Sequence, residues 1–202
     1  MKGIHSLLKT LSILALVSLN SSPLFANYGE PYNFYQPAPS NLLENVEKYH
    51  LNQGVEKVRQ GKYEYAWSEF AFMLHYFPNH PKALQQAANL SIQMESPDRA
   101  ERQFERAIRL YPNEAETHAL YGIFLHNLKK YELAIEEYKK AIALNSHVID
   151  YHYNLGLAYF ALKDYQNARI EAEIAYNKGY PLPGLKDKLK SVRSTDESSS
   201  SS

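Results

Sequence analysis

The feature that most constrains this chain is an internal repeat, in which similar side chains recur at one fixed spacing through four consecutive units. The units have equal length and no gap between them, and they are residues 47–80, 81–114, 115–148 and 149–182. One column holds only small residues and a second only alanine, in the sets Gly54, Ala88, Gly122, Gly156 and Ala66, Ala100, Ala134, Ala168. Apolar residues within each unit follow helical spacing, which predicts pairs of helices. A single pair cannot bury its apolar face, so we expect four stacked pairs with a continuous core.

Further columns carry large apolar rings, small residues and helix-stopping prolines. They are Phe70, Phe104, Tyr138, Ala172; Met73, Ala107, Ala141, Ala175; and Pro78, Pro112, Ser146, Tyr180. Three units also share a tyrosine, at Tyr63, Tyr131 and Tyr165, where the second unit has Pro97. Together the columns resemble the tetratricopeptide repeat (TPR) family over residues 47–182. The resemblance implies an all-α fold, a right-handed α-solenoid of four helix-turn-helix repeats with a concave groove, which binds other proteins and is not an enzyme.

Residues 1–26 have the layout of a secretory signal peptide. Lys2 and Lys9 give a positive start, residues 11–19 are mostly apolar, and Ala26 is a small residue suited to cleavage. The apolar run is shorter than the ~20 residues that span a bilayer. We therefore expect an exported chain, periplasmic or secreted, with no stable membrane anchor after cleavage. The alternative is an uncleaved anchor, because Leu24 is larger than the residue usual two places before the cut.

Residues 27–40 form a Tyr/Pro-rich segment with three prolines, at positions 31, 37 and 39. Proline lacks the amide donor that a helix or a central strand needs, which predicts an extended arm. Either Ser40 or Asn41 is expected to cap the first helix, and Glu44 stands three places after Asn41 as in a capping box. The TPR domain is expected to cover residues 41–193.

The end of the domain should carry a capping helix, because the last repeat would otherwise expose its core face. Residues 184–193 fit this role, since Leu185, Leu189 and Val192 share one helical face. Beyond them, residues 194–202 are rich in serine and are expected to be a disordered tail.

In the family that these repeats resemble, partners bind in the groove lined by the first helix of each repeat. Carried over column by column, the groove is rich in amide side chains, which suit the backbone of an extended peptide. The predicted partner-binding residues are Lys48, Asn52, Arg59, Lys82, Gln86, Asn89, Gln93, Asn127 and Asn154. The alternative is a polar face that contacts only solvent.

One groove column changes sign along the repeats, reading Lys48, Lys82, Glu116, Asp150. A peptide of opposite charge order would bind in one direction, although exposed pairs contribute only about 0–1 kcal/mol each. Ordinary surface charge is the alternative. Some members of the family that the repeats resemble clamp a C-terminal carboxylate with lysine, asparagine and arginine. That set is absent here, because Leu51 and Val55 stand where the first lysine and asparagine would be and Glu116 stands where another lysine is needed.

The second helix of the first repeat is unusually aromatic. Trp67, Phe70, Leu74 and Phe77 share one face and are expected in the core. Tyr65, Phe72 and Tyr76 lie on a different face and form a candidate second surface, which the arm, a second copy of the chain or another partner could cover. The alternative is that amphipathic tyrosines simply cover the convex side.

Composition and motifs argue against catalysis, cofactors and metals. The chain has no cysteine, and its 22 basic and 22 acidic residues leave no excess charge for a nucleic acid. Glu136 and Glu137 are expected on exposed helix faces. The histidine column His50, His118, His152 is expected to pack in place of aromatic rings, because histidines on stacked helices lie ~8–10 Å apart while zinc needs ligands within ~2.1 Å.

These observations favour a non-enzymatic adaptor of the cell envelope that binds a protein or peptide in the concave groove. A second hypothesis is a self-associating module, a homo-oligomer that uses the aromatic face of the first repeat. An envelope enzyme or a glycan binder is the third, and no motif in the sequence indicates either one.

Overall fold

A computed structural model describes residues 30–39 and 41–199, with side chains placed as far as Val192. The chain divides into residues 1–30 and 31–202, and the second unit carries all of the described helices. The predicted signal peptide, residues 1–26, lies outside the described residues. Among the residues that are described, no helix is both long enough and apolar enough to cross a membrane.

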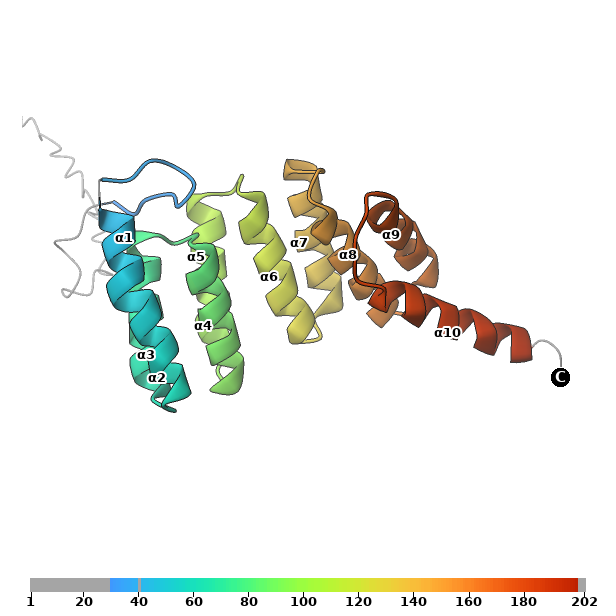
Figure 1. The fold of residues 1–202 in the computed structure, drawn as a ribbon, viewed down its shortest axis with the longest axis horizontal. Helices are drawn as coiled ribbons and strands as arrows, with labels where there is room; N and C mark the ends of the chain where they lie inside the picture. Colours follow the sequence, from blue (N-terminus) through green and yellow to red (C-terminus); the bar gives the residue numbers. More distant parts are fainter. Residues whose placement is uncertain (1–29, 40, 200–202) are drawn as a thin grey trace, which may run out of the picture. The chain divides into compact units, whose positions relative to one another are not determined.

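The second unit is a row of helix pairs (Figure 1). In the first pair, α1 (Leu42–Val46), a π-helical turn η1 (Glu47–Leu51) and α2 (Asn52–Arg59) form one continuous helix that packs on α3 (Tyr63–Tyr76). The later pairs are α4 (Pro81–Gln93) with α5 (Asp98–Leu110), α6 (Ala115–Asn127) with α7 (Tyr131–Leu144), and α8 (Ile149–Ala161) with α9 (Tyr165–Asn177).

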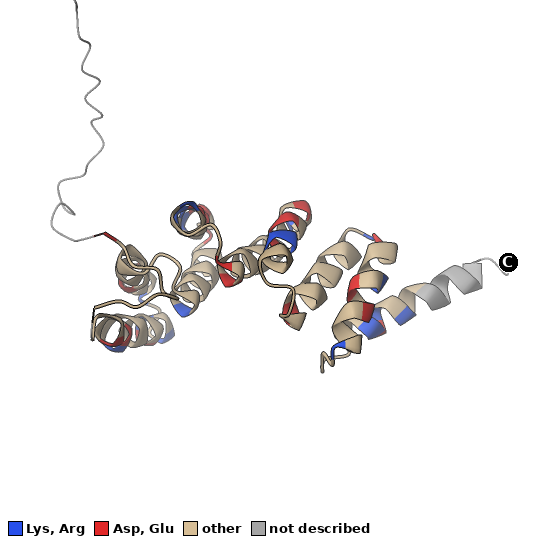
Figure 2. Cartoon of the chain, turned by 90° about the horizontal axis from the view of Figure 1, so that it is seen from above, with Lys and Arg blue, Asp and Glu red and all other residues tan. Residues whose placement is uncertain are grey.

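Each helix packs on the one before it, and the first helices α4, α6 and α8 also contact one another in turn. The final helix, α10 (Gly184–Ser199), packs on α8 and α9. Figure 2 shows the same stack from above. The predicted all-α solenoid of four pairs with a capping helix is therefore confirmed for the described part of the chain.

The small-residue column marks the places where paired helices come closest. Gly122 lies against the ring of Tyr138, and a Cβ added to it would be 2.7 Å from that ring. Gly54 meets Phe70 in the same way. Because Phe70 and Tyr138 are almost fully buried, neither ring has room to move aside for a larger residue.

The fourth repeat fills this space differently. Its aromatic column holds Ala172, and a Cβ on Gly156 would meet Leu185 of α10 at 2.6 Å. Leu185 has no exposed surface. The capping helix thus supplies the bulk that repeat four lacks, in addition to covering its core face.

The turn inside each pair uses a left-handed residue at the same column. These residues are Gly61, Glu95, Lys129 and Lys163, with φ values of 70°, 54°, 61° and 62°. Only the first is glycine, the residue that adopts this conformation without steric cost. In the second repeat, Pro97 follows Glu95 by two residues and stands just before α5. The missing amide hydrogen of proline costs nothing at the start of a helix, so proline is tolerated here in place of the tyrosine of the other repeats.

Two expectations about helix ends are wrong. Asn41 and Glu44 form no capping box, because Asn41 is left-handed with φ 68° and its side chain makes no capping bond. The capping helix also continues past Arg193 to Ser199, so part of the predicted disordered tail is helical. The other candidate cap, Ser40, and the end of the predicted tail, residues 200–202, lie outside the described residues.

The described part of the arm, residues 31–39, is not helical and folds back onto the loops between repeats (Figure 1). The Tyr32 amide donates to the Tyr76 carbonyl oxygen at 2.7 Å, and the Phe34 amide donates to Asn79 Oδ1 at 2.9 Å. Asn79 in turn donates through Nδ2 to Asn33 Oδ1 at 2.7 Å. The last residue of α3 and the loop after it therefore hold the arm, through a backbone bond and side-chain bonds respectively.

The same segment reaches the loop between the second and third repeats. Asn33 Nδ2 donates to Glu114 at 2.7 Å, and the Tyr111 hydroxyl donates to the Pro31 carbonyl oxygen at 2.6 Å. The ring of Phe34 lies 4.6 Å from that of His80. The arm thus joins the first and second repeats along one edge of the solenoid, and through Tyr35 it also bonds Glu116 of the third repeat.

Replacing Asn79 with alanine is expected to release the arm. Asn79 is fully buried and bonds two arm residues, so the change should lower the free energy of unfolding by about 1–3 kcal/mol. Hydrogen exchange at the Tyr32 and Phe34 amides should become about tenfold faster. A matched control is Gln36→Ala, an exposed arm residue, which should change neither quantity. Unchanged exchange in Asn79→Ala would show that other contacts hold the arm.

Candidate binding surfaces

The histidine column is paired with a column of glutamates. His50, His118 and His152 each place Nδ1 against a carboxylate oxygen 19 residues later, on Glu69, Glu137 and Glu171, at 2.6–2.7 Å. Each pair joins the first helix of a repeat to the second. The expectation that Glu137 is exposed is wrong, since it is 8% exposed and belongs to the helix interface.

A signal for these pairs was present in the sequence. In the second repeat the same two columns hold Leu84 and Gln103, so the glutamate is absent only where the histidine is absent. Two columns that change together within one chain indicate contact. The histidine column alone indicates packing, and the pairing becomes visible only when the two columns are compared.

His118 has acceptors on both sides of its ring. Nδ1 lies 2.7 Å from Glu137 Oε2, and Nε2 lies 2.9 Å from the Pro112 carbonyl oxygen. Both ring nitrogens must donate to satisfy these partners, so the imidazole is protonated. The hydrogen bond with Glu137 raises the pKa of His118 above its usual value, against the effect of burial. Burial acts to raise the pKa of Glu137, but hydrogen bonds from His118 and Lys140 lower it overall.

His80 is in the opposite state. Its Nδ1 accepts from the Ala83 amide at 3.2 Å and caps α4, so the proton is on Nε2, which donates to Glu47 at 3.0 Å. Burial lowers the pKa of His80, and Glu47 offsets this only in part. One fold therefore contains a protonated and a neutral buried histidine, and both act in packing.

The nine predicted partner-binding residues all lie on the first helices of the repeats or on η1. Gln86 and Asn154 are half-buried, and the other seven are exposed: Lys48, Asn52, Arg59, Lys82, Asn89, Gln93 and Asn127. Gln93 Nε2 donates to the Tyr63 hydroxyl at 2.6 Å, and Arg59 lies 3.5 Å from Glu56. Their role in binding stays a prediction. We call these nine residues the amide face.

The charge column shares Lys48 and Lys82 with the amide face, and one of its acidic positions is already bonded. The Tyr35 hydroxyl of the arm donates to Glu116 at 2.9 Å. Burial, together with Glu116, raises the pKa of Tyr35 strongly, so the hydroxyl stays protonated. The arm therefore occupies one acidic position of the column that was expected to orient a peptide.

The candidate second surface is partly used by the chain itself. The Tyr65 hydroxyl accepts from Gln53 Nε2 at 2.5 Å, and the Phe72 ring lies 4.0 Å from the His50 ring. Tyr76 holds the arm through its carbonyl oxygen. Tyr65 and Phe72 remain 47% and 36% exposed. Of the expected core face, Phe70, Leu74 and Phe77 are fully buried, while Trp67 is half-buried under the Arg99 guanidinium.

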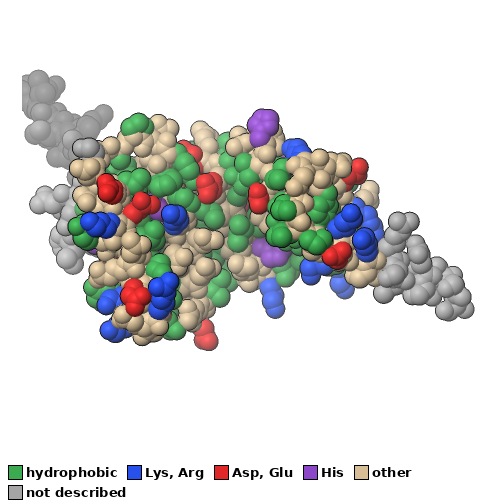
Figure 3. All heavy atoms as spheres, in the orientation of Figure 1, with side chains coloured by type: hydrophobic (Ala, Val, Ile, Leu, Met, Phe, Trp, Pro, Cys, Tyr) green, Lys and Arg blue, Asp and Glu red, His purple; other side chains and the backbone are tan. Residues whose placement is uncertain are grey.

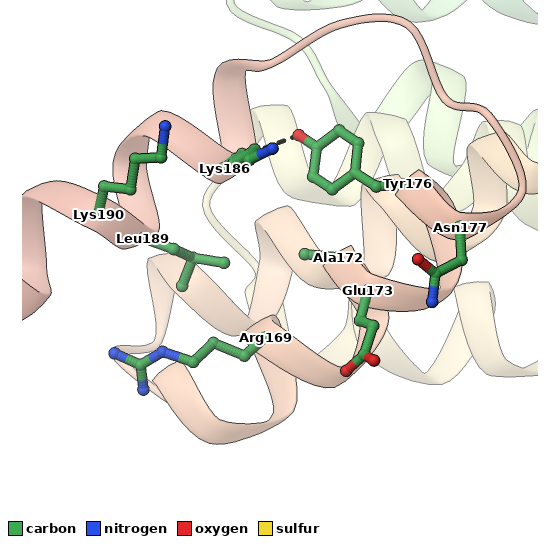
Figure 4. A pocket seen from close by; sticks show the side chains of 8 residues that line it. All are labelled: Arg169, Ala172, Glu173, Tyr176, Asn177, Lys186, Leu189 and Lys190. Carbon is green, nitrogen blue, oxygen red and sulfur yellow. Dashed lines mark hydrogen bonds between the residues drawn. The ribbon is translucent and has the colours of Figure 1, made fainter.

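A pocket that was not predicted lies between α9 and α10 (Figure 4). It is an open hollow of about 380 Å³, and neither the amide face nor the second surface contributes to it. Another hollow, of about 430 Å³, lies beside the arm between Gln36 and Glu47. Within the described residues, no group of three or more histidine, aspartate or glutamate side chains is placed to hold a metal ion.

Sequence comparison supports the repeat. Models described as tetratricopeptide repeat match residues 81–114, 149–180 and 104–136, and one described as TPR repeat matches residues 124–163. A comparison with curated proteins finds no match.

Solved structures share the fold at low sequence identity. The structure of pilF of Pseudomonas aeruginosa has a TM-score of 0.60 at 19% identity, covering 77% of this chain and 71% of that one. A MamA structure has a TM-score of 0.56 at 20% identity, covering 72% and 80%. YrrB, described as a TPR protein with an unusual peptide-binding site, has a TM-score of 0.54 at 18% identity, covering 70% and 73%. With four stacked helix pairs and matching repeat models, this chain belongs to the tetratricopeptide repeat family.

Proposed function

We propose that the chain is a non-enzymatic scaffold of the cell envelope that binds an extended segment of a partner protein along the amide face. The observation that carries the proposal is a set of amide side chains that follow the first helices from α2 to α8. Asn52, Asn89 and Asn127 are exposed, and among the described residues their side chains make no hydrogen bond. Asparagine both donates and accepts, so it can bond the two polar groups of a peptide backbone at once.

Support for a protein partner comes from the family and from one neighbour. TPR repeats form extended surfaces on which partners bind, and the YrrB structure is described as having a peptide-binding site. Support for an envelope location comes only from residues 1–26, whose layout is that of a signal peptide. The fold supports a protein-binding role in general, and the partner is a matter for experiment.

Self-association through an exchanged arm is the competing proposal. It is less well supported, because residues 31–35 bond the chain's own loops. Light scattering separates the two, since a scaffold of this kind is expected to stay monomeric as its concentration rises.

The test of the scaffold is a pull-down from envelope extract with the exported chain. The variant Asn52→Ala, Gln86→Ala, Asn89→Ala, Asn127→Ala should lose the captured protein, because each change removes a donor and an acceptor from the amide face. The control Asn113→Ala with Gln166→Ala removes exposed amides elsewhere and should retain it. A partner that binds all three proteins equally would contradict binding at the amide face, and a captured protein that is a second copy of this chain would favour self-association.

A further inference from the structure

Helix α10 is in register with the first helices of the repeats. Lys186 follows His152 at the same spacing at which His152 follows His118. Lys190 follows Gly156 at this spacing too, so α10 continues the repeat. Helix α10 also packs on α8 and α9 as α8 packs on α6 and α7. It therefore stands where the first helix of a fifth pair would stand. Helix α8 is followed by α9, which packs beside it as the second helix of its pair. No described helix follows α10 in this way, and the open pocket of Figure 4 lies at that place.

The register identifies an unmatched cation in this pocket. In repeats one, three and four, the residue that corresponds to Lys186 is a histidine. Each of these histidines bonds a glutamate carboxylate on the second helix of its own repeat. Lys186 is exposed, and no carboxylate of the described residues forms an ion pair with it. The Lys186 backbone amide donates to the Tyr176 hydroxyl at 3.1 Å, but its side-chain charge has no carboxylate partner among the described residues.

The rest of the pocket has an apolar floor and a mainly basic rim. Ala172 of α9 and Leu189 of α10 point toward each other in Figure 4, and both are buried. The charged lining residues are Arg169, Lys186 and Lys190, against one carboxylate, Glu173. Lys190 lies 3.9 Å from Asp187, but both side chains are more than 60% exposed, so this contact leaves its charge largely available. Basic side chains gather where α9 meets α10 in Figure 3.

We propose that this pocket, lined by α9 and α10, is a docking site for an acidic amphipathic helix of a partner protein, bound where the second helix of a fifth repeat would lie. A carboxylate of that helix pairs with Lys186, and its apolar side chains cover Ala172 and Leu189. Lys190 occupies the column that holds glycine or alanine in the four repeats. Because its long side chain takes the space that an aromatic ring fills elsewhere, the residue of the docked helix that faces it must be small. This site is separate from the amide face, and its occupancy does not depend on the function proposed there.

The chain itself supplies a probe of the right shape. Helix α9 fills the equivalent position on α8, with Glu171 on His152 and the small Ala172 in the aromatic column. A fluorescein-labelled peptide of residues 164–177 with Arg169→Glu carries four carboxylates and no lysine or arginine. Its binding to protein purified after expression of the complete sequence is measured by fluorescence anisotropy, at low salt and at 0.5 M salt.

The peptide is expected to bind saturably and more weakly at high salt. Lys186→Glu should weaken binding about fivefold, because an attractive rim pair becomes repulsive. A peptide that also carries Glu171→Lys should recover affinity for Lys186→Glu but not for the native protein. The control is Lys188→Glu, an equal change of charge on the same helix, whose lysine lies over the Phe160 ring outside the pocket. This control should bind the first peptide within about twofold of native.

Three results would overturn the proposal. The first is no binding by the native protein at millimolar concentration. The second is equal weakening by Lys186→Glu and Lys188→Glu, which would indicate attraction by overall charge alone. The third is sedimentation showing that the protein forms dimers that Lys186→Glu abolishes, which would make a second copy the occupant. Circular dichroism of both variants shows whether either change unfolds the chain.

Discussion

Replacing Leu185 with alanine is expected to lower the free energy of unfolding by about 2–5 kcal/mol, the range for removing a large aliphatic side chain from a core. Leu185 is fully buried and fills the space over Gly156 that an aromatic ring fills in the earlier repeats. The surrounding helices are held by their own contacts and can close the cavity only in part. Urea unfolding followed by circular dichroism measures the loss.

The repeat provides both a control and a rescue for this change. Leu182→Ala, at a side chain that is 57% exposed, should alter stability by no more than about 0.5 kcal/mol. The double change Leu185→Ala with Ala172→Phe recreates the pair Phe70 and Ala83 found between the first two repeats. It should be more stable than Leu185→Ala alone. A loss below about 1 kcal/mol for Leu185→Ala would mean that α10 is not an integral part of the core.

Replacing His118 with leucine is expected to destabilise the protein by about 3 kcal/mol. The change leaves the buried Glu137 carboxylate with only Lys140, whose side chain is 53% exposed. Adding Glu137→Gln recreates the Leu84 and Gln103 pair of the second repeat and should recover most of the loss. His147→Leu, at an exposed histidine, is the control and should have little effect. A double variant no more stable than His118→Leu would contradict the coupling of these two columns.

The pair also predicts a dependence on pH. The pKa of His118 is raised above 6.5, so its contribution to stability is complete below that pH and is lost as the pH rises through the folded-state pKa. The pKa of Glu137 is lowered from 4.5, so its contribution is lost only as the pH falls through its lower folded-state value. The stability difference between the native protein and His118→Leu should therefore be largest between about pH 4.5 and 6.5 and should shrink toward pH 9. A stability difference as large at pH 9 as between pH 4.5 and 6.5 would contradict a raised pKa of His118 as its source.

Much of the fold could be read from the columns. The positions of Gly54, Ala66 and Phe70 and their counterparts predicted the number of helix pairs and the residues of the core, because these depend on a periodic pattern within each repeat. The burial of Glu137 could not be read in this way. A glutamate on a helix is ordinarily exposed, and only its neighbour across the interface shows that this one is paired.

The candidate sites were predictable to a smaller extent. The sequence assigned the amide face to the first helices, where the structure places all nine residues, and it named the arm as one candidate cover for the aromatic second helix. It did not indicate that Asn33 and Tyr35 bond Glu114 and Glu116, because those partners are more than 80 positions away in the chain. The pocket on α10 was missed for a similar reason, since it arises where two helices meet.

By itself, then, the sequence determined which segments become helices, how many pairs stack and which side chains enter the core, because each of these follows from local periodicity. The tertiary structure alone decided that Leu185 replaces a missing ring, that His118 is charged while His80 is neutral, and that Lys186 faces an open pocket. Each of these depends on which side chain lies across an interface, and that is decided only when separate helices pack together.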